Sequence, residues 1–159
     1  MKSKKLALIL GAGLIYVGGQ MNTNKFIYYG VIGGDLQIKA YIKMVAHVVN
    51  KTNAHDAELL LAETIAIESQ NGNAKDHSKK YGEGLTQFDR ATFEAIKKRF
   101  SLSKNFAIVE RIKSYLFTDI TKINYEDLRT NPMASIIYAR LLYLTVSAPI
   151  PTTFQGRWE

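Results

Sequence analysis

The run Ile65-Ala66-Ile67-Glu68-Ser69 ends on an acid, and the glycine-rich turn Gly82-Glu83-Gly84-Leu85-Thr86-Gln87-Phe88 follows it. Burial of a carboxyl group disfavours its charged form and raises its pKa, so an acid in an apolar setting can hold a proton near neutral pH. Cleavage of an acid-labile acetal requires such a group. The small side chains of the turn also let a sugar ring approach the backbone closely. Together the two stretches predict a polysaccharide-cleaving site.

Composition limits the class of protein. The 159 residues suit one domain, and 47% apolar residues is ordinary for a globular protein. A mean hydropathy of −0.10 excludes a polytopic membrane protein. The net charge of +7 favours an anionic partner, which can be nucleic acid, acidic lipid or an acidic cell-wall polymer. Cysteine is absent from the sequence, which excludes disulfides and cysteine-based metal sites.

The amino terminus is typical of an export signal. Lys2, Lys4 and Lys5 precede an uncharged run over residues 6–19. A removed signal and an uncleaved signal anchor both fit this pattern, and the lysines predict a cytoplasmic start with an outward-facing domain. We therefore expect a signal or membrane anchor plus linker over residues 1–34, containing a hydrophobic helix, and a functional domain over residues 35–159.

The rest of the chain has mainly helical periodicity. In the segment Ala57–Ser69, apolar residues cover most of the circumference, which predicts a helix buried on most sides. Strand signals are sparse, and we expect at most a short β-hairpin near Tyr81–Leu85. The predicted helices cover Leu36–Asn50, Ala57–Ser69, Thr86–Phe100, Asn105–Phe117 and Asn131–Val146.

Three segments carry a family resemblance. They are Ile65–Ser69, then Tyr81-Gly82-x-Gly84-Leu85-x-Gln87-Phe88, and then Asn131-Pro132-Met133-Ala134-Ser135-Ile136-Ile137-Tyr138-Ala139. In this order they resemble the signature of the lysozyme-like lytic transglycosylases of the soluble-lytic (SLT) type. The sequence departs from that pattern: Thr86 replaces the usual methionine, Phe88 an aliphatic residue, Ser135 a glycine and Ala139 a leucine, and Glu83 adds a charge inside the turn.

The resemblance implies a mainly α, lysozyme-like helical domain that cleaves the β-1,4 bond between N-acetylmuramic acid and N-acetylglucosamine in peptidoglycan. By this resemblance Glu68 is the catalytic acid and base, and the product is a 1,6-anhydro sugar. It also implies a position for Tyr138 near Glu68, and it requires no cofactor or metal. The residues implied to contact the glycan or to support the acid are Ser69, Tyr81, Gly82, Gly84, Leu85, Gln87, Phe88 and Tyr138.

Two alternatives remain open. If Glu83, Asp76 or Asp89 positions a water, the enzyme is an inverting muramidase, whose two carboxyl groups stand about 6.5–9.5 Å apart. Glu83, inside the turn, is the candidate second carboxylate. The other alternative is a non-catalytic structural protein of an envelope or virion, built on a lysozyme-like scaffold.

The expected partners follow from these hypotheses. They are peptidoglycan glycan strands, the membrane through the N-terminal segment, and a secretion apparatus, a conjugation apparatus or a virion. Localisation is expected in the cell envelope, exported or anchored in the inner membrane with the domain facing the wall, or in the virion of a phage. Nucleic acid is not an expected partner, because the basic residues are dispersed. The three histidines show no metal-ligand spacing.

Overall fold

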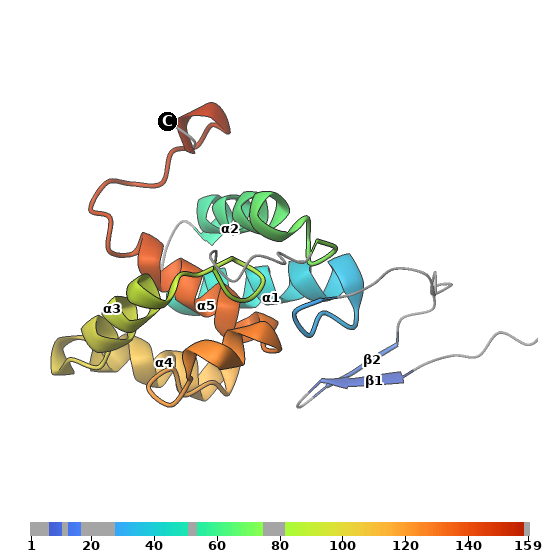
Figure 1. Cartoon of the computed structure of the whole chain (residues 1–159), viewed down its shortest axis with the longest axis horizontal. Helices are drawn as coiled ribbons and strands as arrows, with labels where there is room; N and C mark the ends of the chain where they lie inside the picture. The colour runs from blue at the N-terminus through green and yellow to red at the C-terminus, as the bar shows by residue number, and fades with distance from the viewer. Residues whose placement is uncertain (1–6, 11–12, 17–27, 51–53, 75–81, 158–159) are drawn as a thin grey trace, which may run out of the picture.

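The computed structural model describes residues 7–10, 13–16, 28–50, 54–74 and 82–157, and α-helices make up most of this part of the chain (Figure 1). The protein is therefore mainly helical, as predicted. Strands β1 (Ala7–Leu10) and β2 (Gly13–Tyr16) pair antiparallel in the N-terminal segment. The predicted hydrophobic helix there also includes residues 11, 12 and 17–19, which lie outside the described residues. Within the described ranges, no helix has both the length and the apolar character needed to cross a membrane.

Helices α1 (Gly34–Val49) and α2 (Ala54–Ser69) open the helical domain. The predicted apolar face of α1 is confirmed, since Ile38, Ile42, Val45, Ala46 and Val49 are all buried. The prediction that α2 is buried on most sides is wrong. Its buried residues form one stripe because α2 packs against α1 and α5 from the outside of the bundle (Figure 1). This arrangement leaves the remaining side of α2, including Ile67 with 56% exposure, in solvent.

Helices α3 (Arg90–Phe100), α4 (Phe106–Leu116) and α5 (Pro132–Tyr143) complete the bundle, with short 3₁₀ turns η1 (Ser103–Asn105), η2 (Tyr125–Arg129) and η3 (Gln155–Arg157). Helix α3 begins four residues after its predicted start at Thr86. The reason is a cap: Asp89 accepts a 2.8 Å hydrogen bond from the Thr92 amide and fixes the first turn there. Pro132 occupies the first turn of α5, where its missing N–H is not needed.

Helix α5 is the centre of the fold. It packs against α1, α2, α3 and η2, and Ile136, Ile137 and Leu141 have no exposed surface. The core extends to Val31, which is 1% exposed. The packed unit therefore begins before residue 35, where the sequence predicted the domain boundary.

Candidate active site

Glu68 lies one residue before the end of α2, with an exposed side chain. One helical turn earlier, Thr64 Oγ1 shares a 2.7 Å hydrogen bond with the Tyr143 hydroxyl of α5. Burial raises the pKa of Tyr143, and the charge of Glu68 raises it further, so the acid stands near this hydroxyl pair. Atoms packed along one side of Glu68 remove part of its water although the side chain is exposed. This partial burial raises the pKa of Glu68.

The carboxylates of α2 are held differently. Glu63 accepts hydrogen bonds of 2.8 and 2.5 Å from Arg157 of the C-terminal segment. Glu58 lies 3.1 Å from His47 Nε2. Among the described residues, no hydrogen bond or ion pair holds the Glu68 carboxylate. Within the described residues, Glu68 therefore differs from Glu58 and Glu63 in having no such partner.

Ser69 closes α2 from inside. Its side chain is fully buried, its hydroxyl donates to the Ile65 carbonyl at 3.1 Å, and it accepts from the Gly72 amide at 3.1 Å. After it, Gln70, Asn71 and Gly72 all have positive φ, so the chain reverses sharply behind the acid. Because Ser69 is buried, the predicted glycan contact of its hydroxyl is corrected to a structural role: it fixes the helix end that carries Glu68.

The turn Gly82–Phe88 is closed by a backbone bridge. Glu83 and Phe88 exchange N–H···O bonds of 2.7 and 2.9 Å, which gives a hairpin-like bridge where a short hairpin was predicted. Glycine is required at two positions. A Cβ on Gly82 would lie 1.7 Å from the Gln87 carbonyl oxygen, and one on Gly84 would lie 2.6 Å from the Leu128 carbonyl oxygen, at φ +77°. Tyr81, also predicted for the site, lies outside the described residues.

Helix α5 holds the turn through two buried hydroxyl groups. The Thr86 amide donates to Ser135 Oγ at 3.1 Å, Thr86 Oγ1 donates to the Ser135 carbonyl at 3.2 Å, and the two hydroxyls lie 2.9 Å apart. These are two of the positions where the sequence departs from the family pattern. The two departures bond to each other, and they connect the second segment of the resemblance to the third.

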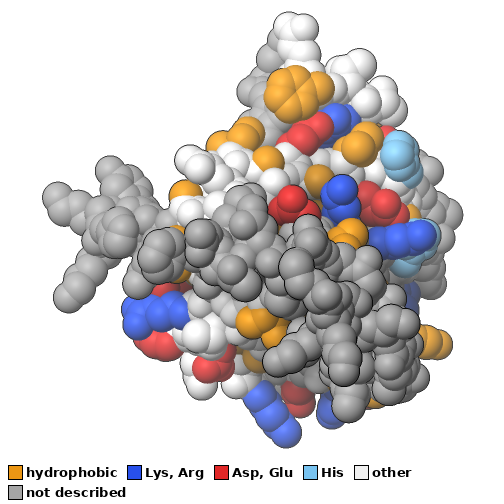
Figure 2. Space-filling view, turned by 90° about the vertical axis from the view of Figure 1, so that its right-hand side faces the viewer, with side chains coloured by type: hydrophobic (Ala, Val, Ile, Leu, Met, Phe, Trp, Pro, Cys, Tyr) orange, Lys and Arg blue, Asp and Glu red, His pale blue; other side chains and the backbone are white. Residues whose placement is uncertain are grey.

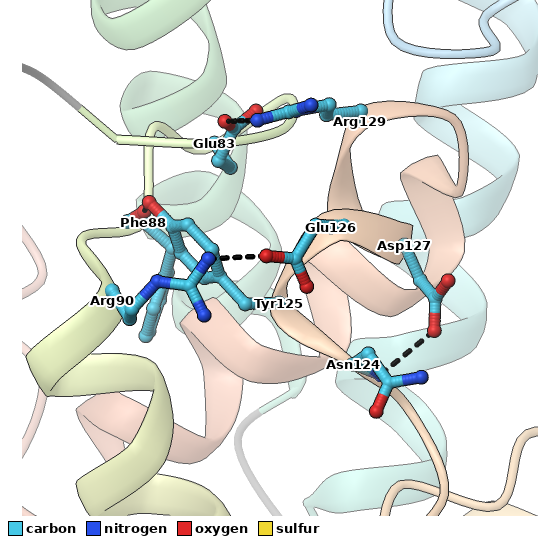
Figure 3. A network of polar contacts seen from close by, with 8 residues as sticks. All are labelled: Glu83, Phe88, Arg90, Asn124, Tyr125, Glu126, Asp127 and Arg129. Carbon is cyan, nitrogen blue, oxygen red and sulfur yellow. Dashed lines mark hydrogen bonds and ion pairs between the residues drawn. The ribbon is translucent and has the colours of Figure 1, made fainter. Parts of the chain in front are cut away.

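The 3₁₀ turn η2 holds the other side of the turn through a polar network (Figure 3). Tyr125 donates its hydroxyl to the Phe88 carbonyl at 2.8 Å, and Arg129 pairs with Glu83 at 2.5 Å. Arg90 pairs with Glu126 and lies 4.4 Å above the Tyr125 ring. The candidate second carboxylate, Glu83, is thus bound to an arginine.

Of the three side chains of the turn that were predicted to contact the glycan, two are buried and one is half-buried. Leu85 and Phe88 are buried, with 0% and 5% exposure, so their predicted glycan contacts are corrected to a structural role: both side chains pack in the core and support the turn. Gln87 is half-buried at φ 47°, and its Nε2 donates to the Tyr29 hydroxyl and to the Gly84 carbonyl, both at 2.9 Å. Its Oε1 is buried and has no hydrogen-bond partner among the described residues. Gln87 therefore retains an unused acceptor.

Tyr138 lies in the core, which corrects its predicted place in the site. Its side chain is 0% exposed, its hydroxyl donates to the Ile120 carbonyl at 2.8 Å, and its ring stacks on Phe93 at 4.4 Å. Tyr143, five residues later on α5, is the tyrosine near Glu68. Two residues five positions apart point about 140° away from each other around the helix axis, so Tyr138 and Tyr143 lie on different faces of α5. The sequence did not predict a place for Tyr143 near Glu68, because the family pattern stops at Ala139.

The described residues contain no cluster of three or more metal-ligating side chains. A hollow of about 170 Å³ opens between α3 and α4, lined by residues such as Phe100, Phe106 and Asp119, and α2 contributes nothing to its lining. A scan against protein-family models, a search of curated proteins and a search of solved structures each returned no match to this chain. Function must therefore be argued from the side chains and their arrangement.

Proposed function

We propose that this protein is a peptidoglycan lytic transglycosylase with Glu68 as its one catalytic carboxyl group. One observation carries the proposal: the turn bonds to α5 and also packs against the loop that directly follows the helix bearing Glu68. Thr86 of the turn bonds to Ser135 of α5, and Leu85 of the turn lies against Gly72, which follows the helix that bears Glu68. A lysozyme-like arrangement of this helical domain, preceded by an N-terminal hydrophobic helix, belongs to the same proposal.

The chemistry needs one group that gives and then takes a proton. Glu68 protonates the glycosidic oxygen between N-acetylmuramic acid and N-acetylglucosamine, and the C1–O4 bond breaks. The Glu68 carboxylate then accepts the proton of the muramoyl 6-hydroxyl while O6 bonds to C1. No water is consumed, and the acid returns to its protonated form. The raised pKa of Glu68 favours the first step, and the absence of a partner for it among the described residues favours both.

The contacts of the other carboxylates favour this route over a water-using muramidase. Glu83 is paired with Arg129, and Asp89 caps α3 through the Thr92 amide. Hydrogen bonds from the Thr92 side chain and amide lower the pKa of Asp89. Both acids already hold the fold together. Asp76, the remaining candidate for positioning a water, lies outside the described residues.

Attachment and partners complete the proposal. The N-terminal segment tethers the domain to the membrane, facing the wall, in the service of a phage or an envelope-spanning apparatus. Figure 2 shows acidic and basic side chains interspersed on the described part of one face. Spread in this way, the net charge of +7 supports general attraction to an anionic wall polymer.

Clearing of a peptidoglycan suspension by the full chain tests the proposal. We expect the wild type to clear the suspension, Glu68→Gln to lose clearing while keeping its far-UV circular dichroism, and Glu63→Gln to clear it. Glu63 is the matched control because it lies on the same helix and is paired with Arg157. Clearing by Glu68→Gln at the wild-type rate would contradict the assignment.

A further inference from the structure

The segment Tyr28–Val31, before α1, lies where the loop after α2 meets the turn. The Tyr28 amide donates to the Gly72 carbonyl at 3.0 Å. A Cβ on Gly72 would lie 3.3 Å from Leu85 and 3.4 Å from Val31, so these side chains already fill the space around this glycine. The segment is therefore packed against the elements that carry Glu68 and Gln87.

Gly30 brings in the third element. It has φ +74°, and a Cβ there would lie 2.1 Å from the Thr130 carbonyl oxygen and 3.2 Å from Pro132. Only glycine fits this approach to the start of α5. Residues 28–31 thus contact all three parts of the proposed site, although the sequence prediction assigned them to a linker.

Tyr29 acts on the site through Gln87. Its hydroxyl accepts one Nε2 hydrogen of Gln87, and the Gly84 carbonyl accepts the other. Because a carbonyl can only accept, the amide nitrogen must face Gly84, which fixes the orientation of the carboxamide. In the part of the chain that the structure describes, Gln87 Oε1 is then a buried acceptor to which no group donates. Leaving a buried acceptor unpaired is costly, so this atom gains most from a donor that a ligand supplies.

The backbone supports a functional reason for this pair. Tyr29 has φ 60° and Gln87 has φ 47°, so both residues of the bond adopt the left-handed conformation that non-glycine residues avoid. Each such residue costs about 1–2 kcal/mol. Strain on both sides of one hydrogen bond indicates that its position is imposed by the surrounding fold.

We propose that Tyr29 is a positioning residue: its hydroxyl holds the Gln87 carboxamide so that Oε1 accepts a hydrogen bond from a hydroxyl or an acetamido N–H of the glycan once binding displaces the atoms that cover Oε1. This inference rests on the proposed function, because it deepens the description of the same site. Tyr29 itself need not touch the sugar, and its loss weakens binding only through Gln87.

The test uses soluble, uncross-linked glycan strands and the full chain carrying Glu68→Gln, so that binding is measured without cleavage. We expect Tyr29→Phe to weaken binding about five- to tenfold, the loss of one hydrogen bond. Gln87→Leu should weaken it at least as much, and the double variant no further than Gln87→Leu alone. Tyr41→Phe is the matched control, since Tyr41 also accepts from a glutamine Nε2, that of Gln37, within α1. It should bind as the background does.

The side-chain amide signals of Gln87 in ¹⁵N NMR provide a readout independent of the glycan. They should shift in Tyr29→Phe and not in Tyr41→Phe, while thermal unfolding shows that each variant is folded. Binding with no effect of Tyr29→Phe, or an effect that adds fully to that of Gln87→Leu, overturns the inference and leaves the proposed function standing. Absence of glycan binding by the folded Glu68→Gln background overturns both.

Discussion

The end of α2 and the turn Gly82–Phe88 each carry an acid, and the two acids differ in whether a protein partner holds them. At the end of α2, Glu68 is exposed and, within the described part of the chain, has no ion pair or hydrogen bond. In the turn, Glu83 is paired with Arg129, and Thr86 is bonded to Ser135 of α5. The turn is thus held rigidly by its neighbours, whereas no described residue holds the acid at the end of α2.

This difference indicates how the two regions divide the proposed work. A group that must give and take a proton needs to be free of protein partners, whereas a surface that orients a ligand needs to be rigid. The supports of the turn come from η2 and α5, so the rigid side of the site is built by the second half of the chain. The acid comes from the first half.

The largest expected effect is a difference in the rate of glycan cleavage between variants of Glu68 and of Glu83. Glu68→Gln should lower the rate of glycan cleavage by a factor of about 10² to 10⁴, as expected for loss of a general acid. Glu83→Gln should lower it by about tenfold at most, because that side chain stabilises the turn through Arg129. Initial rates of muropeptide release measure both. Equal losses in the two variants would make Glu83 the second carboxylate of a muramidase.

The next effect concerns the rigidity of the turn. Gly84→Ala should lower the free energy of unfolding by about 3 kcal/mol, because it adds backbone strain and a clash with the Leu128 carbonyl. Gly34→Ala is the matched control, since Gly34 has φ +58° with nothing within 4 Å of the added Cβ. Strain alone should cost it about 1 kcal/mol. Urea unfolding compares them, and equal losses would show that the turn is not tightly packed.

A smaller effect tests the contact between the turn and α5. Ser135→Ala leaves the buried Thr86 amide without its acceptor and should cost about 1–2 kcal/mol of unfolding free energy. Thr86→Val removes the hydroxyl partner and should cost a similar amount. The double variant should lose less than the sum, since the residues share one network. Full additivity in urea unfolding would show that the two hydroxyls do not interact.

The smallest effect is the pH dependence of stability at Glu68. Because its pKa is raised by partial burial, the folded protein binds this proton more tightly than the unfolded chain does. Stability contributed by Glu68 therefore falls as pH rises from the ordinary carboxyl pKa through the raised one. Glu68→Gln should be at least as stable as the wild type at about pH 7, with a difference that narrows toward about pH 4. Melting temperatures that diverge on acidification would contradict this sign.

Periodicity predicted most of the helices well because they bury one apolar face, as α1 does with Ile38, Ile42 and Val45. Periodicity failed at the start of α3, where specific hydrogen bonds decide the backbone conformation. Thr86 was assigned to a helix, yet it bonds to Ser135, 49 residues away, and Asp89 starts α3 instead. A contact over that distance leaves no periodic trace in the sequence.

The candidate site was predicted in outline, and its side chains were partly misassigned. Glu68 and the glycine turn stand out by residue type, whereas a motif cannot distinguish a residue that faces the ligand from one that supports it. Ser69 and Tyr138 are both fully buried. Tyr29 was missed because it lies in an irregular segment and acts only through its hydrogen bond to Gln87.

Mass analysis of the muropeptides that the full chain releases from purified peptidoglycan is the decisive measurement. With Glu68 as the one catalytic carboxyl group, the proposed mechanism predicts 1,6-anhydro-muramoyl ends from the wild type and no release from Glu68→Gln. Reducing muramoyl ends would show that water is the nucleophile and would require a second carboxylate. The absence of any released fragment from the folded wild type would contradict catalysis altogether.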